Sequence, residues 1–154
     1  MTNDQNPTYL AAQLSDIATL LNFMQAYYAL DHLPIDREGA GAALKGILQD
    51  GSLGEVWLIQ ADNQSIGYVV LTLGYSLEFL GRDAFVDELY IQADYRRQGI
   101  GSKTLTFIQE RCQALGVKAL HLEVERENTQ AQAVYRKVGF EDHDRYLLTK
   151  WIRE

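Results

Sequence analysis

Two arginines and two glycines stand together in the segment R-R-Q-G-I-G-S-K. The pattern predicts a strand that ends near Gln92 and a helix that begins at Gly101. The first turn of a helix carries unpaired N–H groups and the positive end of the helix dipole. Glycine lets a ligand approach the backbone closely. With Arg96, Arg97 and Lys103 beside them, these groups predict a pocket for phosphate or pyrophosphate. The segment fits neither the G-x-G-x-x-G dinucleotide loop nor the P-loop.

A second block follows with the pattern N-x-x-A-x-x-x-Y-x-x-x-G-F. Its fixed positions are Asn128, Ala131, Tyr135, Gly139 and Phe140. Together the two blocks resemble the GNAT family of N-acetyltransferases, whose pyrophosphate loop reads [RQ]-x-x-G-x-[GA] between a strand and a helix. The segment from residue 96 to residue 101 matches every fixed position of that loop. The resemblance covers nearly the whole chain and implies acetyl-CoA as co-substrate, with no metal.

The resemblance also implies where acetyl-CoA binds. In such proteins the end of the long central strand binds the pantetheine arm through backbone groups, which here belong to Leu89, Tyr90 and Ile91. The amide of Leu89 is expected to polarise the thioester carbonyl. The pyrophosphate is expected on the loop and the first helical turn, which comprise Arg96, Arg97, Gln98, Gly99, Ile100, Gly101 and Ser102.

The second block supplies three more site residues by resemblance. Asn128 and Ala131 are expected at the pantetheine region or the loop near it, and Tyr135 is expected to donate a proton to the departing thiolate. Without the resemblance, Tyr135 is interpreted as a helix residue that packs on the sheet. Asn128 is then interpreted as a cap residue before a helix.

The base is expected to be a carboxylate, because a lysine-like amine has a pKa of about 10.4 and must lose a proton before it attacks. Relatives place this carboxylate either on the long strand, at Asp87 or Glu88 here, or on the next strand, at Glu123. Successive side chains of a strand alternate, so only one of the first two can face a cleft unless a bulge intervenes. The stretch from residue 74 to residue 91 resembles the polyamine and thialysine acetyltransferase branch, in which an acidic residue aligned with Asp87 lies at the substrate. We therefore expect Asp87, followed by Glu88 and Glu123.

The expected site residues must be positioned by strands and helices, which the sequence patterns also predict. The patterns predict strands at 8–12, 55–60, 66–75, 84–92, 118–124 and 146–152, and helices from Ile17, from about Asp36, over 101–115 and over 129–138. On the long strand we expect one face with Phe85, Asp87, Leu89 and Ile91, and the other with Val86, Glu88 and Tyr90. The predicted class is α/β (α+β): a single-domain acetyltransferase fold over residues 1–154. Its mixed, mostly antiparallel sheet has six to seven strands and is flanked by four helices.

Composition excludes several classes of protein. The chain has 154 residues, is 47% hydrophobic and 23% charged, and carries a formal charge of −7, which disfavours nonspecific nucleic-acid binding. One cysteine excludes a disulfide framework or a multi-cysteine zinc site, and His32, His121 and His143 lack metal-ligand spacing. No apolar run reaches the ~20 residues of a membrane helix, and the first residues do not form a secretory signal. We expect a cytoplasmic protein with no membrane or nucleic-acid partner, and the resemblance implies a homodimer.

The preferred function is transfer of an acetyl group to a primary amine of a small molecule, polyamine- or amino-acid-like. Direct attack in a ternary complex is expected, because no cysteine lies in the motif to carry the acetyl group. The first alternative is acetylation of protein or peptide N-termini or lysines, which the position of Glu123 also suits. The second is a regulatory module that binds CoA without catalysis.

Overall fold

Five strands form one mixed sheet in the computed structural model, which describes residues 6–153. The order is β1 (Thr8–Ala11), β2 (Gly54–Ala61), β3 (Gln64–Ser76), β4 (Gly81–Ile91) and β5 (Ala119–His121). The first four strands are antiparallel to their neighbours, whereas β5 joins β4 in parallel. The mixed, mostly antiparallel architecture predicted from the sequence is confirmed.

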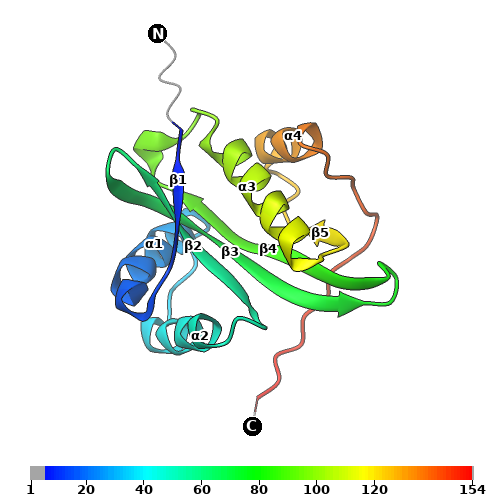
Figure 1. Ribbon diagram of the computed structural model, residues 1–154, viewed down its shortest axis with the longest axis horizontal. Coiled ribbons are helices and arrows are strands. Elements are labelled where there is room, and N and C mark those ends of the chain that lie inside the picture. Colours follow the sequence, from blue (N-terminus) through cyan, green and yellow to red (C-terminus); the bar gives the residue numbers. More distant parts are fainter. Residues whose placement is uncertain (1–5, 154) are drawn as a thin grey trace.

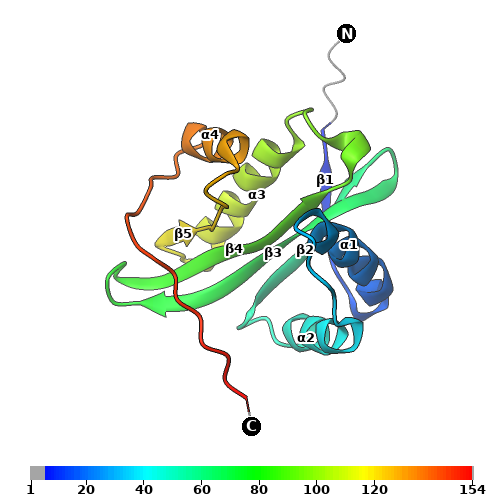
Figure 2. The same ribbon diagram turned by 180° about the vertical axis from the view of Figure 1, so that it is seen from behind.

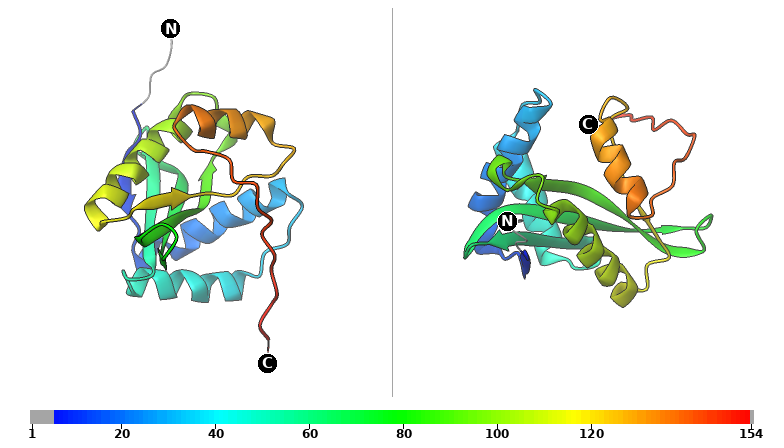
Figure 3. Two further views of the ribbon diagram at one scale, coloured as in Figure 1. Left: turned by 90° about the vertical axis from the view of Figure 1, so that its right-hand side faces the viewer. Right: turned by 90° about the horizontal axis from the view of Figure 1, so that it is seen from above.

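Helices cover both faces of this sheet (Figure 1, Figure 2). Two pack on one face, α1 (Ile17–Leu30), preceded by the 3₁₀ turn η1 (Leu14–Asp16), and α2 (Arg37–Gln49). On the opposite face lies α3 (Ile100–Leu115), which follows the 3₁₀ turn η2 (Ala93–Tyr95). Figure 3 shows α1 and α3 on opposite sides of the strands. The last helix, α4 (Thr129–Lys137), follows β5 and also packs against the cluster under α3.

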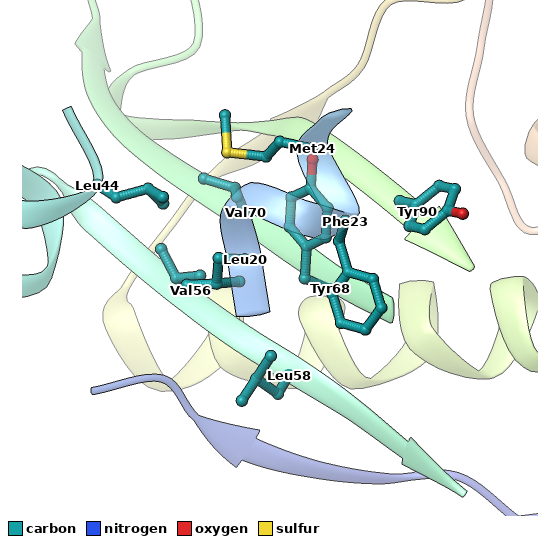
Figure 4. Close-up of a cluster of buried hydrophobic side chains, with 9 residues drawn as sticks. All are labelled: Leu20, Phe23, Met24, Leu44, Val56, Leu58, Tyr68, Val70 and Tyr90. Carbon is teal, nitrogen blue, oxygen red and sulfur yellow. The ribbon is translucent and has the colours of Figure 1, made fainter. Parts of the chain in front are cut away.

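The core beneath α1 joins residues that lie far apart in sequence (Figure 4). Leu20 and Tyr68 are fully buried there, and the rings of Phe23 and Tyr68 stack with centroids 6.2 Å apart. Burial of a side chain of this size contributes about 1.5–3 kcal/mol. This packing fixes α1 against β3 and β4, and therefore fixes the tyrosines at the end of α1 relative to the middle of β4.

A bulge interrupts β4. Val70 of β3 faces Glu88, but the next residue, Leu71, faces Val86, so Asp87 is an extra residue without a partner on β3. As a result Val86 packs under α3 with Leu89, while Tyr90 packs under α1. The prediction is confirmed for Glu88 with Tyr90 and for Leu89 with Ile91, but Val86 lies on the opposite face from the predicted one, because strict alternation holds only for an unbulged strand.

The C-terminal part of the chain also departs from prediction. The predicted strand at 118–124 is present only as Ala119–His121, and the predicted strand at 146–152 is absent, since residues 141–153 form no regular element. The described chain thus has five strands and four α-helices, whereas six to seven strands were expected. Residues 146–152 include side chains that favour strands, but among residues 6–153 no neighbouring strand satisfies their backbone groups.

Candidate active site

The loop between β4 and α3 presents an open helix N-terminus. Gly99 is the N-cap of α3, with a φ of 79° and no side-chain cap. The first intrahelical bond runs from the N–H of Lys103 to the carbonyl of Gly99, at 3.1 Å. A Cβ built on Gly99 would meet no atom within 4 Å, so the space before the helix is clear. The N–H groups of the first turn and this clear space fit a pyrophosphate group.

Arg96 ties this loop to the end of β4. Its Nε donates to the carbonyl of Ile91 at 2.8 Å, and its guanidinium lies 5.6 Å from the ring centroid of Tyr90. Gln98 donates to the carbonyl of Asp94 at 3.2 Å. Arg96 is therefore held against the end of β4, and Arg97, which has a φ of 63°, follows directly.

The edge of β4 toward β5 becomes free after Phe85. Parallel pairing with β5 covers only Asp83 to Phe85, and no strand described in this chain continues it. The backbone from Leu89 to Ile91 lies on that free stretch. An extended ligand with amide groups could add to this edge as a strand would.

A small pocket of about 90 Å³ opens beside the bulge of β4. It is lined by Phe85, Val86, Asp87 and Glu123, so the structure brings two of the three expected carboxylates to one place. Asp87 is accessible to solvent at the pocket, yet the protein around it partly desolvates the carboxyl and raises its pKa. The raised pKa makes this carboxylate a stronger base than a fully hydrated one.

Glu88 lies in a different environment, on the side of α1. Tyr28 donates a hydrogen bond to Oε2 at 2.5 Å, and Tyr68 donates one to Oε1 at 2.8 Å. Burial raises the pKa of Glu88, these two bonds lower it, and the charge of Asp87 raises it again. The three carboxylates therefore lie in two environments. Asp87 and Glu123 line the pocket, whereas Glu88 accepts hydrogen bonds from two tyrosine hydroxyls.

Tyr135 is half-buried in α4. Its ring packs edge-on against Phe140 with centroids 6.1 Å apart, and burial raises the pKa of its phenol. Burial also raises the pKa of Tyr27 to about 12, with further contributions from the charges of Glu88 and Tyr135. A phenol with a raised pKa stays protonated and can donate a proton.

Asn128 caps α4, because its Oδ1 accepts a hydrogen bond from the N–H of Ala131 at 3.1 Å. This is the local role that the sequence offered as the alternative for Asn128. The contact of Asn128 and Ala131 with a cofactor stays a prediction.

Sequence reasoning missed the tyrosines around Glu88. Tyr27 and Tyr28 lie in the last turns of α1, and Tyr68 lies on β3, far in sequence from either motif. The available signal was the pairing of β3 with β4, which places Tyr68 beside Tyr90 and diagonal to Glu88. The contribution of α1 could not be found this way, because it depends on packing.

Two further observations bear on the expected partners. No group of three or more His, Cys, Asp and Glu side chains between residues 6 and 153 could hold a metal ion. His121 instead pairs with Asp83 at 3.1 Å. Among the helices described, none is long and apolar enough to cross a membrane.

Comparison with known proteins identifies the family. Residues 20–140 match the family model described as "Acetyltransferase (GNAT) family". The chain is 27% identical over 132 residues to "Uncharacterized N-acetyltransferase YhfO" of Bacillus subtilis (strain 168), covering 85% of this chain and 87% of that protein. It is 32% identical over 77 residues to a thialysine N-epsilon-acetyltransferase of Bos taurus, covering 50% of this chain and 45% of that protein.

Solved structures share the fold. The integron cassette protein HFX_CASS3, from the mobile metagenome of Cole Harbour Salt Marsh, is 32% identical, with a TM-score of 0.84 over 95% of this chain and 91% of that one. The aminoglycoside N-acetyltransferase AAC(6')-Iy, in complex with CoA, has a TM-score of 0.79 at 15% identity, over 96% and 95% of the two chains. The family match, the N-acetyltransferase relatives and the shared fold lead to one conclusion: the chain belongs to the acetyltransferase (GNAT) family, which uses acetyl-CoA, and is an N-acetyltransferase.

Proposed function

We propose that this enzyme acetylates a primary amine of a small cationic molecule, polyamine- or amino-acid-like. The observation that carries the proposal is the charge of the site. Asp87 and Glu88 are both partly desolvated, and within the described chain neither forms an ion pair with lysine or arginine. Carboxylates in this state favour a cationic ligand, which restores the interactions lost with water. The similarity to the Bos taurus thialysine enzyme supports the same class of acceptor.

Acetyl-CoA supplies the thioester that is attacked, and this chain supplies the groups that hold it. Its pyrophosphate would lie on Arg96, Arg97 and the N–H groups that begin α3. Its pantetheine arm would run along the free edge of β4, where Leu89 is proposed to donate its N–H to the thioester carbonyl. Tyr135 is proposed as the proton donor to the sulfur.

Asp87 is proposed as the base. It shares the pocket with Glu123, while both oxygens of Glu88 already accept hydrogen bonds from tyrosines. Asp87 would take the proton of the ammonium group, directly or through a water, and so leave a neutral amine to attack. Glu88 and Glu123 are the alternative bases.

A second candidate acceptor is a peptide N-terminus. Glu123 lines the same pocket as Asp87, and its position suits a base for that substrate. The homodimer and the cytoplasmic location also belong to the proposal, since they rest on the resemblance and on the sequence.

A panel of amines tests the proposal. The enzyme is incubated with saturating acetyl-CoA and spermidine, thialysine, lysine, an aminoglycoside or a short peptide, and free thiol release is followed. We expect the highest kcat/KM with spermidine or thialysine. Highest turnover with the peptide would replace the proposal by the second candidate. Tight binding of CoA with no turnover of any amine would contradict both and favour a regulatory module.

A further inference from the structure

Tyr95 joins the loop between β4 and α3 to a neighbouring turn of the sheet. It is the last residue of η2, and its hydroxyl accepts a hydrogen bond from Nε2 of Gln64 at 2.7 Å and donates one to Oδ2 of Asp62 at 3.2 Å. Figure 1 and Figure 2 show the turn between β2 and β3, which carries both partners, beside η2. The partners precede Tyr95 by 31 and 33 residues, so the tertiary fold brings them to the loop.

The turn between β2 and β3 is a fixed anchor for this contact. It has only two residues, Asp62 and Asn63, because Ala61 of β2 pairs directly with Gln64 of β3. Both turn residues have a left-handed φ, 52° and 62°, as in the type I′ turn that suits a hairpin. The hairpin itself therefore holds the two groups that bind the Tyr95 hydroxyl.

The ring of Tyr95 is held as well. It packs against the buried cluster formed by Ile59, Ala61, Ile66 and Ile100. Ile100 is the first residue of α3 and directly follows its N-cap, Gly99. Tyr95 and Ile100 thus stand on either side of residues 96–99. The ring and the hydroxyl of Tyr95 together fix one end of the segment on which the pyrophosphate is proposed to bind.

We propose that Tyr95 is a positioning residue for acetyl-CoA, which holds the loop between β4 and α3 in the conformation that receives the pyrophosphate. The inference rests on the proposed binding of the pyrophosphate to this loop. Backbone N–H groups bind an anion well when they are already directed at one point, because ordering them during binding would cost affinity. Tyr95 acts through the loop, so its hydroxyl should matter for the binding of acetyl-CoA and not for the chemical step.

Tyr95→Phe tests the proposal, since it keeps the ring in its cluster and removes both hydrogen bonds of the hydroxyl. Calorimetry with CoA, which needs no acceptor, is expected to show affinity about fivefold weaker than wild type, the factor that corresponds to one net hydrogen bond. In turnover of an amine at saturating acetyl-CoA, kcat should stay within twofold of wild type.

S-acetylpantetheine distinguishes a displaced loop from a general loss of structure. It has the thioester and the pantetheine arm but no pyrophosphate. Tyr95→Phe should therefore raise KM for acetyl-CoA and leave KM for S-acetylpantetheine unchanged. An equal rise for both thioesters would show that the substitution damages the site as a whole, and the proposal would be wrong.

Tyr9→Phe is the matched control. Tyr9 packs against the same cluster, and its hydroxyl shares a hydrogen bond of 3.0 Å with Oγ1 of Thr104 on α3. This variant also loses a phenol hydrogen bond, but outside the loop, and should bind CoA within twofold of wild type. If it binds CoA as weakly as Tyr95→Phe, the effect comes from loosening of the cluster and not from the position of the loop.

Gln64→Ala removes one of the two hydrogen bonds from the side of the hairpin. It should weaken CoA binding in the same direction, and the double variant should bind no more weakly than Tyr95→Phe, because both substitutions act through one contact. Additive losses, or wild-type affinity in Tyr95→Phe, would overturn the proposal. If Gly99→Ala still weakens binding in that last case, the pyrophosphate site stands without a role for Tyr95; wild-type affinity in both would contradict the site itself.

Discussion

Asp87 is the extra residue of the β4 bulge, and it faces the pocket with Glu123. Asp87→Asn keeps the shape of the side chain but removes its basicity. We expect kcat/KM at neutral pH to fall by about 10²–10⁴-fold, the range for loss of a general base. The deficit should shrink as the pH rises toward the pKa of the amine, because more substrate then arrives neutral. Steady-state rates across pH measure both effects.

Two control variants accompany Asp87→Asn. Glu88→Gln and Glu123→Gln should each retain a rate closer to the wild type. If one of them shows the pH-dependent loss instead, the base is that residue. If all three keep the wild-type rate at every pH, no single carboxylate on these two segments is the base.

Tyr68 offers a separate test of Glu88, because its hydroxyl donates to the carboxylate and lowers the pKa of Glu88. Tyr68→Phe removes that bond and should raise the pKa of Glu88. With Asp87 as base, the acid limb of the kcat/KM profile should stay in place. With Glu88 as base, the limb should move up by about one pH unit, the size of one hydrogen bond to a charged group.

Tyr68→Phe should also change how the stability of the folded protein depends on pH. Burial raises the pKa of Glu88 in the folded state, so its favourable contribution is present below its unfolded pKa and is lost as the pH rises through the folded pKa. Tyr68→Phe raises the folded pKa further. The difference in melting temperature between Tyr68→Phe and wild type should therefore be larger at pH 7 than near pH 4. A difference independent of pH would show that the hydroxyl does not act through the ionised carboxylate.

A substitution can distinguish the packing role of the Tyr135 ring from the proposed role of its hydroxyl as a proton donor. Tyr135→Phe keeps the ring against Phe140 and removes only the hydroxyl. We expect acetyl-CoA affinity to be retained in calorimetry and kcat to fall by about 10²-fold. Tyr75→Phe, on an exposed side chain of β3, is the control and should change neither value. An unchanged kcat in Tyr135→Phe would leave Tyr135 with the packing role.

At the scale of elements, β4 shows what the sequence could and could not predict. Its position, its length to within a few residues and its hairpin with β3 follow from alternating apolar residues and the turn before it. The bulge could not be predicted, because the residue types at positions 85–89 do not indicate which residue lacks a partner on β3. The expectation that Asp87 lies at the substrate therefore rests on the resemblance, and the alternation used beside it fails at the bulge.

The helix that follows provides a prediction with an internal control. Gly99 and Gly116 begin and end α3, both have a left-handed φ, and a Cβ at either would meet nothing within 4 Å. Gly99→Ala and Gly116→Ala should therefore each lower the free energy of unfolding by about 1–2 kcal/mol. Only Gly99→Ala places a methyl group where the pyrophosphate must approach, so only it should weaken acetyl-CoA binding, by tenfold or more. Equal affinities in the two variants would contradict the loop assignment.

At the scale of the whole molecule, the fold could be predicted as far as local patterns and the family resemblance reach. All four helices begin within about one residue of the predicted start, and the two with a predicted end also end within one residue of it, because apolar spacing and caps are local. The prediction of a C-terminal strand is wrong because strand formation depends on a partner that is distant in sequence. Residues 146–152 have side chains that favour a strand, but a strand forms only beside a neighbouring strand, and the described part of the chain places none there.

The charge of the whole molecule gives the last prediction. The chain carries −7, and the acidic site would attract a cationic amine over several ångströms at low salt. The screening length falls from about 30 Å at 0.01 M salt to about 3 Å at 1 M. With acetyl-CoA saturating, kcat/KM for spermidine should therefore fall several-fold across this range, while kcat changes little because bound substrate is already in place. A zwitterionic amino acid is the control acceptor, and its kcat/KM should fall less, since its carboxylate opposes the attraction. If kcat/KM for spermidine stays constant or rises with salt, the site does not select its acceptor by positive charge, and the uncompensated carboxylates need another role.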